Sequence, residues 1–110
     1  MNLKIISLSS FEKDVKRLYK KYRQLPEDLK TLLMSLSADP RSGIALSRGL
    51  YKIRIRNRSA GTGKSSGFRV IYYYVDEQEK VYLLKIYSKN EMASISEGML
   101  VDILIKNGLD

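Results

Sequence analysis

Residues 50–75 read LYKIRIRNRSAGTGKSSGFRVIYYYV, two segments of strand-like composition separated by a glycine-rich loop. In residues 50–58 a basic side chain occupies every second position, and this basic set consists of Lys52, Arg54, Arg56 and Arg58. Because successive side chains of a strand point to opposite faces, the spacing predicts four cations along one face of one strand. Neighbouring like charges repel each other, so such a row indicates a surface against which something anionic binds.

The positive charge of the whole chain is concentrated in the same region. Residues 40–75 hold eight basic side chains and no Asp or Glu. The chain has 20 Lys and Arg residues against 12 Asp and Glu residues, so the 12 basic residues elsewhere balance all the acidic ones. A basic excess confined to one segment is typical of an electrostatic binding surface, such as one for nucleic acid.

The composition excludes several kinds of site and protein. A chain of 110 residues with 44% hydrophobic residues is typical of one globular domain, residues 1–110. The sequence contains no His and no Cys, which excludes the usual zinc ligands, a Ser-His-Asp triad and disulfides, and we expect no metal and no other cofactor. There is no apolar run of membrane-spanning length and no signal-peptide pattern, so we expect a cytoplasmic protein without a membrane partner.

Hydrophobic periodicity predicts an α+β domain. The expected elements are a strand at 2–8, a helical hairpin at 9–24 and 25–38, an irregular segment at 44–49, strands at 50–58, 67–75 and 80–89, and a helix at 94–107. Capping boxes beginning at Ser9 and Ser94 predict the starts of the first and last helices. The order β-α-α-β-β-β-α separates the helices from a run of strands, which favours a twisted, mainly antiparallel sheet.

Alternation in the last predicted strand places a tyrosine among cations. Val81, Leu83, Lys85, Tyr87 and Lys89 are expected to share one face. A phenol beside two lysines near a strand end suits phosphate binding or proton transfer, and ordinary packing of Tyr87 in the sheet is the alternative.

The glycine-rich loop contains Gly-Lys-Ser at 63–65 but does not match a nucleotide-binding P-loop. That motif requires a glycine where this chain has Arg58, and it requires a helix where 67–75 reads as a strand. We therefore expect no nucleotide cofactor, and we expect the loop to bring backbone N–H groups and Lys64 near a phosphate.

The chain resembles the RelE/ParE toxin superfamily over essentially its whole length, and the HigB/RelE-type mRNA interferases most. The resemblance rests on the helical hairpin, on YKIRIR at 51–56, on GKSSGFRVIYY at 63–73 and on YSKNE at 87–91. It implies a toxin that cleaves translated mRNA on the ribosome and is neutralised by a cognate antitoxin.

Carried over position by position, the resemblance implies a set of site residues. The basic strand of the family falls on Lys52, Arg54 and Arg56, to which Arg58 adds a further RNA-binding cation. The catalytic set is then Arg56, Lys64, Arg69, Tyr87, Lys89 and Glu91. The chain departs from the RelE pattern at 91–97, which holds no tyrosine.

The implied reaction is metal-free attack of a ribose 2′-OH on the adjacent phosphate. Arg56 and Arg69 suit the oxyanion, because a guanidinium stays charged and presents paired donors. Lys64, Glu91 and Tyr87 remain alternatives for the general base. A structural ion pair with Glu91 is the alternative role for Arg69.

Two other functions share the expected fold. One is a ParE-like inhibitor of DNA gyrase, which would not need the concentrated basic segment. The other is a non-catalytic RNA-binding module.

Overall fold

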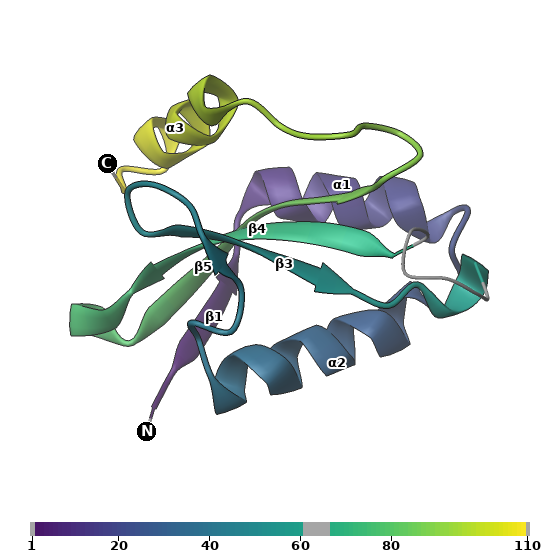
Figure 1. Cartoon of the computed structure of the whole chain (residues 1–110), viewed down its shortest axis with the longest axis horizontal. Helices are drawn as coiled ribbons and strands as arrows, with labels where there is room; N and C mark the ends of the chain where they lie inside the picture. The colour runs from purple at the N-terminus through teal and green to yellow at the C-terminus, as the bar shows by residue number, and fades with distance from the viewer. Residues whose placement is uncertain (1, 61–66, 110) are drawn as a thin grey trace.

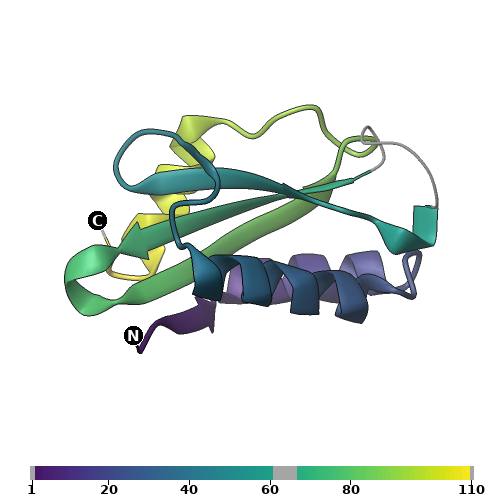
Figure 2. The ribbon, with the colours of Figure 1, turned by 60° about the horizontal axis from the view of Figure 1, so that its bottom comes forward.

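A sheet with helices on both faces forms the centre of the protein (Figures 1 and 2). The computed structural model describes residues 2–60 and 67–109. Its elements are β1 (Lys4–Ser7), α1 (Ser9–Tyr19), α2 (Leu25–Ala38), β2 (Ile44–Ala45), β3 (Leu50–Ile55), η1 (Arg58–Ala60), β4 (Phe68–Val75), η3 (Asp76–Gln78), β5 (Lys80–Ser88) and α3 (Glu97–Lys106).

The strand order confirms the expected α+β class. The five strands lie in the order β1-β5-β4-β3-β2, and only β1 and β5 pair in parallel. The short strand β2 was not expected, because residues 44–49 were predicted to be irregular. It pairs with β3 through a tight hairpin in which Arg48 and Gly49 have φ values of 59° and 82°. Positive φ at both central positions matches the right-handed twist of the flanking strands.

Helix α1 begins at Ser9 as expected, but neither Ser9 nor Ser94 is the residue that caps a helix. The residue before α1 is Leu8, whose side chain makes no capping hydrogen bond, and the Ser10 hydroxyl donates instead to the Leu84 carbonyl at 2.6 Å. Helix α1 also ends at Tyr19, five residues before the expected Gln24. The last helix begins at Glu97 because Ser96, rather than Ser94, accepts a hydrogen bond from the Met99 N–H. A contact between Ser10 and β5 thus takes the place of the first expected capping box, and capping by Ser96 takes the place of the second.

Each face of the sheet carries its own hydrophobic cluster. Helices α1 and α2 lie side by side on one face, and α3 lies on the other (Figures 1 and 2). The first cluster joins α1 and α2 to the sheet and includes Phe11, Leu18, Leu32, Leu36, Phe68, Val70 and Tyr72. The second joins α3 to the sheet and includes Leu50, Ile71, Leu84, Tyr87, Leu100 and Leu104. We call these surfaces the hairpin face and the α3 face.

The expected alternation in β5 is wrong because the strand contains a β-bulge. Ile71 pairs with Lys85 whereas Tyr72 pairs with Leu83, so Leu84 is an extra residue in the ladder. Before the bulge the odd-numbered Leu83 packs on the hairpin face, and after it the odd-numbered Tyr87 packs on the α3 face. A bulge of this kind reverses the side-chain alternation beyond it.

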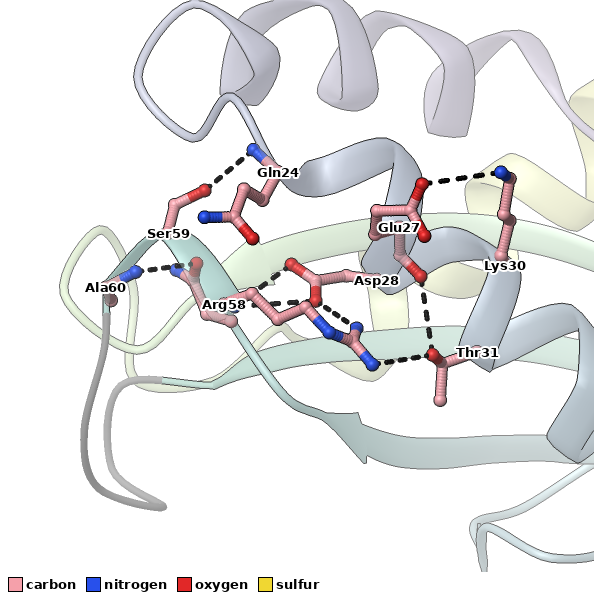
Figure 3. A network of polar contacts seen from close by, with 9 residues as sticks. Gln24, Glu27, Asp28, Lys30, Thr31, Arg58, Ser59 and Ala60 are labelled. Atoms are coloured by element: carbon pink, nitrogen blue, oxygen red, sulfur yellow. Dashed lines mark hydrogen bonds and ion pairs between the residues drawn. The ribbon is translucent and has the colours of Figure 1, made fainter.

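The end of β3 is held to the start of α2 by a polar network (Figure 3). The fully buried carboxylate of Asp28 accepts from the Arg58 guanidinium at 2.7 Å and from the Arg58 backbone N–H at 3.2 Å. The Arg58 guanidinium also donates to the Thr31 hydroxyl at 3.1 Å. Ser59 accepts from the Gln24 N–H at 2.8 Å. These contacts fix residues 58–60 against α2.

The expectation that Arg58 continues the basic row of β3 is therefore wrong. The strand ends at Ile55, and Arg58 lies in η1 with its charge directed to Asp28. A buried carboxylate requires a partner of this kind, since an unpaired buried charge is strongly destabilising.

We predict that Asp28→Ala lowers the free energy of unfolding by roughly 1–3 kcal/mol, because it leaves the Arg58 N–H and guanidinium without their acceptor. The measurement is urea unfolding followed by circular dichroism. The neighbouring Glu27→Ala is the control, since its exposed pair with Lys30 contributes about 0–1 kcal/mol. Equal effects of the two substitutions would contradict the structural role of Asp28.

Candidate functional site

Two arginines and a tyrosine form one row across three neighbouring strands. Arg69 of β4 lies directly opposite Arg54 of β3 on one side and opposite Tyr87 of β5 on the other. Side chains at directly opposed positions lie on the same face, with their Cβ atoms about 4.5–5.5 Å apart. The bulge at Leu84 is what brings Tyr87 to this face. The row lies on the α3 face, because Tyr87 belongs to the hydrophobic cluster of that face. It is formed near the ends of β3 and β5 and at the start of β4.

Arg69 is a buried cation. The residue is only 6% exposed, and its guanidinium donates to the Gly67 carbonyl at 3.0 Å. Within residues 2–60 and 67–109, no ion pair involves Arg69. The alternative ion pair with Glu91 is not formed, because the Glu91 carboxylate pairs with Arg17. Such a guanidinium presents unused donors and a positive charge toward whatever binds this face.

Tyr87 is 2% exposed and packs in the cluster of the α3 face. Burial raises the pKa of its phenol above the ordinary value, although the nearby Arg69 acts in the opposite direction. The phenol is therefore protonated at neutral pH and is equipped to donate a hydrogen bond or a proton. A neutral phenol is a poor general base, so this environment disfavours one of the three alternatives left open by the sequence.

The other cations of β3 extend the row toward solvent. Lys52 lies opposite Ile71, two residues before Arg54 and on the same face, and it is half-buried. Arg54 and Arg56 are exposed, and Arg56 follows the last residue of β3. Across the described ranges, no ion pair uses any of these three cations. The charge density of this edge is thus available to an anionic ligand.

The remaining expected site residues are not shown to join the row. Lys64 lies outside the described residues. Lys89 is exposed and follows the last residue of β5. The two Glu91 carboxylate oxygens accept hydrogen bonds from the Arg17 guanidinium and, at 3.1 Å, from the Ser88 N–H. Glu91 therefore has structural partners that the sequence did not indicate.

A buried carboxylate on α1 was missed. Asp14 is 5% exposed and accepts from Arg17 at 3.2 Å, from Lys85 at 3.0 Å and from the Ile86 backbone N–H at 3.1 Å. The signal that could have revealed it is helical spacing, because Asp14 lies three residues after Phe11 and four before Leu18 on the apolar stripe. A carboxylate on such a stripe requires partners from another element.

Neither a metal cluster nor a membrane span is found in the part of the chain that the structure describes. None of its His, Cys, Asp or Glu side chains form a group of three or more that could hold a metal ion. No helix there is long and apolar enough to cross a membrane.

Solved toxin structures have the same fold. RelE from E. coli, determined as a mutant in the free state, superimposes with a TM-score of 0.58 and 22% identity, covering 84% of this chain and 90% of that one. RelBE2, a toxin–antitoxin complex from Mycobacterium tuberculosis, gives a TM-score of 0.58 and 22% identity, with 80% of this chain and 99% of that chain covered. The intact RelBE complex of E. coli gives 0.57 and 22%, covering 79% and 96%. At this identity the likeness establishes a RelE-like fold.

The sequence itself matches a family model over most of its length. The model describes the ParE toxin of the type II toxin–antitoxin system parDE, and it matches residues 5–92. The match spans β1 through β5 and so includes every strand that carries the basic row. The chain therefore belongs to the ParE toxin family, within the RelE/ParE superfamily, and is a toxin of a type II toxin–antitoxin system.

Proposed function

We propose that this toxin is an endoribonuclease that cleaves ribosome-bound mRNA at the row formed by Arg54, Arg69 and Tyr87. The observation that carries the proposal is the buried Arg69 guanidinium, which has no ion-pair partner among the described residues and lies between a second arginine and a protonated phenol. A scissile phosphate is the ligand that this combination of donors suits. The sequence resemblance to RelE-type mRNA interferases supports the same reaction.

The proposed reaction needs three tasks from the site. A ribose 2′-OH loses its proton and attacks the adjacent phosphorus, and the bond to the 5′ oxygen breaks to leave a cyclic phosphate and a 5′-OH. Arg69 stabilises the charge on the phosphoryl oxygens, because it remains protonated and presents several donors in one plane. Tyr87 is placed to donate a hydrogen bond or the proton that the leaving oxygen requires.

The surrounding cations would bind the RNA strand. Lys52 and Arg54 lie on one face of β3, with a spacing of roughly 6–7 Å between alternate residues, and Arg56 follows the end of the strand. The three cations would contact successive phosphates. Lys64 and Lys89 remain proposed members of the site. With Tyr87 protonated and Glu91 engaged by Arg17, Lys64 is the general base we favour.

A cognate antitoxin is the proposed protein partner. The RelBE and RelBE2 structures are toxin–antitoxin complexes of the same fold. A highly basic toxin surface would be neutralised most directly by a partner that supplies acidic side chains to it.

Inhibition of DNA gyrase is the second candidate, and the match to the ParE family model favours it. The two functions separate in a supercoiling assay with purified gyrase. The wild-type toxin is expected to leave supercoiling unchanged while it cleaves mRNA on ribosomes. Inhibition of supercoiling without RNA cleavage would establish the gyrase function instead, and binding to RNA without cleavage would indicate a non-catalytic module.

We predict that Arg69→Met reduces mRNA cleavage by about 10²–10³-fold, the loss typical of removing one donor to a transition-state oxyanion. Methionine preserves most of the side-chain volume, and no described carboxylate loses its partner, so the fold is expected to persist. The measurements are primer extension on mRNA from programmed ribosomes and a thermal melt.

The matched control is Arg41→Met. Arg41 pairs with Asp76 just beyond the opposite end of β4. The Arg41→Met protein should therefore cleave mRNA at the wild-type rate. Wild-type cleavage by the Arg69→Met protein would refute the catalytic assignment.

We predict that Lys52→Ala and Arg54→Ala each flatten the dependence of log affinity for programmed ribosomes on log salt by about one unit. Each substitution removes one cation that releases counterions on binding RNA. Lys30→Ala on α2, where the lysine pairs with Glu27, serves as the control and should leave the slope unchanged. An unaltered slope in both test variants would mean that the strand does not contact phosphates.

A further inference from the structure

Two carboxylates hold the backbone of β5 on either side of Tyr87. The Ile86 N–H donates to Asp14 at 3.1 Å, and the Ser88 N–H donates to Glu91 at 3.1 Å. Asp14 comes from α1, whereas Glu91 lies in the segment that follows β5. The residue between these two anchored amides is Tyr87, whose side chain lies on the opposite face beside Arg69.

These carboxylates accept hydrogen bonds from β5 where no neighbouring strand is present to accept them. Strand β1 pairs with β5 only from Lys80 to Leu83, and its last contact is the Leu8 N–H to the Leu83 carbonyl at 3.0 Å. Beyond that point β5 has a strand neighbour only on the β4 side. Buried N–H groups require acceptors, and Asp14 and Glu91 provide them where the sheet does not.

Arg17 connects the two carboxylates. Its guanidinium donates from one nitrogen to Asp14 at 3.2 Å and from another to Glu91. Burial alone would lower the pKa of Arg17, but its hydrogen bonds to Glu91 and Asp14 outweigh that effect and raise the pKa. The forked, planar guanidinium presents separate nitrogens to the two acceptors while it stays charged.

We propose that Arg17 is a positioning residue, which clamps β5 through Asp14 and Glu91 and so keeps the Tyr87 phenol aligned with Arg69. Arg17 acts through the backbone, because α1 lies on the hairpin face and Tyr87 on the α3 face. The catalytic consequence rests on the proposed function. In this proposal Glu91 helps to hold β5 in place and is not the general base.

Charge balance explains why the clamp needs an arginine. Asp14 and Glu91 both accept from β5 at positions only two residues apart, so their negative charges lie near each other. A cation that contacts both carboxylates offsets the repulsion between them. Among the residues that the structure describes, Lys85 forms an ion pair with Asp14 and none with Glu91, whereas Arg17 pairs with both carboxylates.

The first test is amide hydrogen exchange of the Arg17→Met protein, measured by NMR in native buffer. The Ile86, Tyr87 and Ser88 amides are expected to exchange at least 10-fold faster than in the wild type, while the amides of Val70 and Ile71 in β4 change little. Arg23→Met, on the neighbouring segment after α1, is the matched control and should have wild-type protection. Unchanged exchange at 86–88 overturns the clamp, whatever the cleavage assays show.

The second test is a double-mutant cycle on single-turnover mRNA cleavage with Arg17→Met and Tyr87→Phe. A small misplacement of a catalytic group costs up to about 10²-fold, so Arg17→Met is expected to lower the rate by about 10–100-fold with little change in KM. In the Tyr87→Phe background the same substitution should change the rate less than about 3-fold, because residues that act as a unit are non-additive. Additive losses would overturn the positioning role.

One further variant and the wild-type toxin itself separate the possible failures. Glu91→Gln keeps an acceptor for the Ser88 N–H but loses the charge that attracts Arg17, so it should slow cleavage and retain the wild-type pH–rate profile. Loss of the acidic limb of that profile would identify Glu91 as the base and overturn its supporting role. If the wild-type toxin does not cleave RNA at all, the proposed function fails, and the exchange measurement still decides whether the clamp exists.

Discussion

The bulge at Leu84 is the constraint on which the candidate site depends. In a regular strand Tyr87 would share a face with Val81 and Leu83, which pack against the helical hairpin. The extra residue in β5 turns Tyr87 to the α3 face, directly opposite Arg69. Bulges next to active sites re-aim single side chains in this manner. One inserted residue therefore places the Tyr87 phenol in the cluster of the α3 face beside Arg69, while Val81 and Leu83 pack on the hairpin face.

The bulge also coincides with the end of support from β1. That strand accompanies β5 only as far as Leu83, so the segment after the bulge is anchored by β4 and by the carboxylates of Asp14 and Glu91. Side-chain acceptors allow the β5 backbone to be irregular here, because they do not impose the regular hydrogen-bond register of a neighbouring strand. Polar side-chain contacts thus take the place of a neighbouring strand where the β5 backbone becomes irregular.

Much of the fold could be predicted from the sequence, because β3 alternates with a period of two, β4 is a short apolar and aromatic run, and the helices have clear apolar stripes. The same reasoning placed Lys52 and Arg54 on one face, whereas Arg69 was identified through the family resemblance. The face predicted for Tyr87 was wrong, because the hydrophobic pattern of β5 does not reveal the bulge that reverses its alternation. Sequence reasoning also failed for Arg17 and Arg58, since each is defined by a carboxylate distant in sequence, Glu91 at a separation of 74 residues and Asp28 at 30.

Asp14, Asp28 and Arg69 are buried charges among the described residues. They differ in how their charge is balanced, and this difference distinguishes the structural carboxylates from the candidate functional arginine. Asp14 and Asp28 each receive a cation and a backbone N–H, as expected of carboxylates that hold elements together. Arg69 receives one carbonyl among the described residues, which accepts a hydrogen bond but leaves the charge unbalanced. An anion bound at Arg69 would supply the missing charge, so in the proposed complex with RNA the electrostatic cost of the free toxin would become binding energy. Because a phosphate gains charge in the transition state of the proposed reaction, the same imbalance would favour the transition state over the bound substrate.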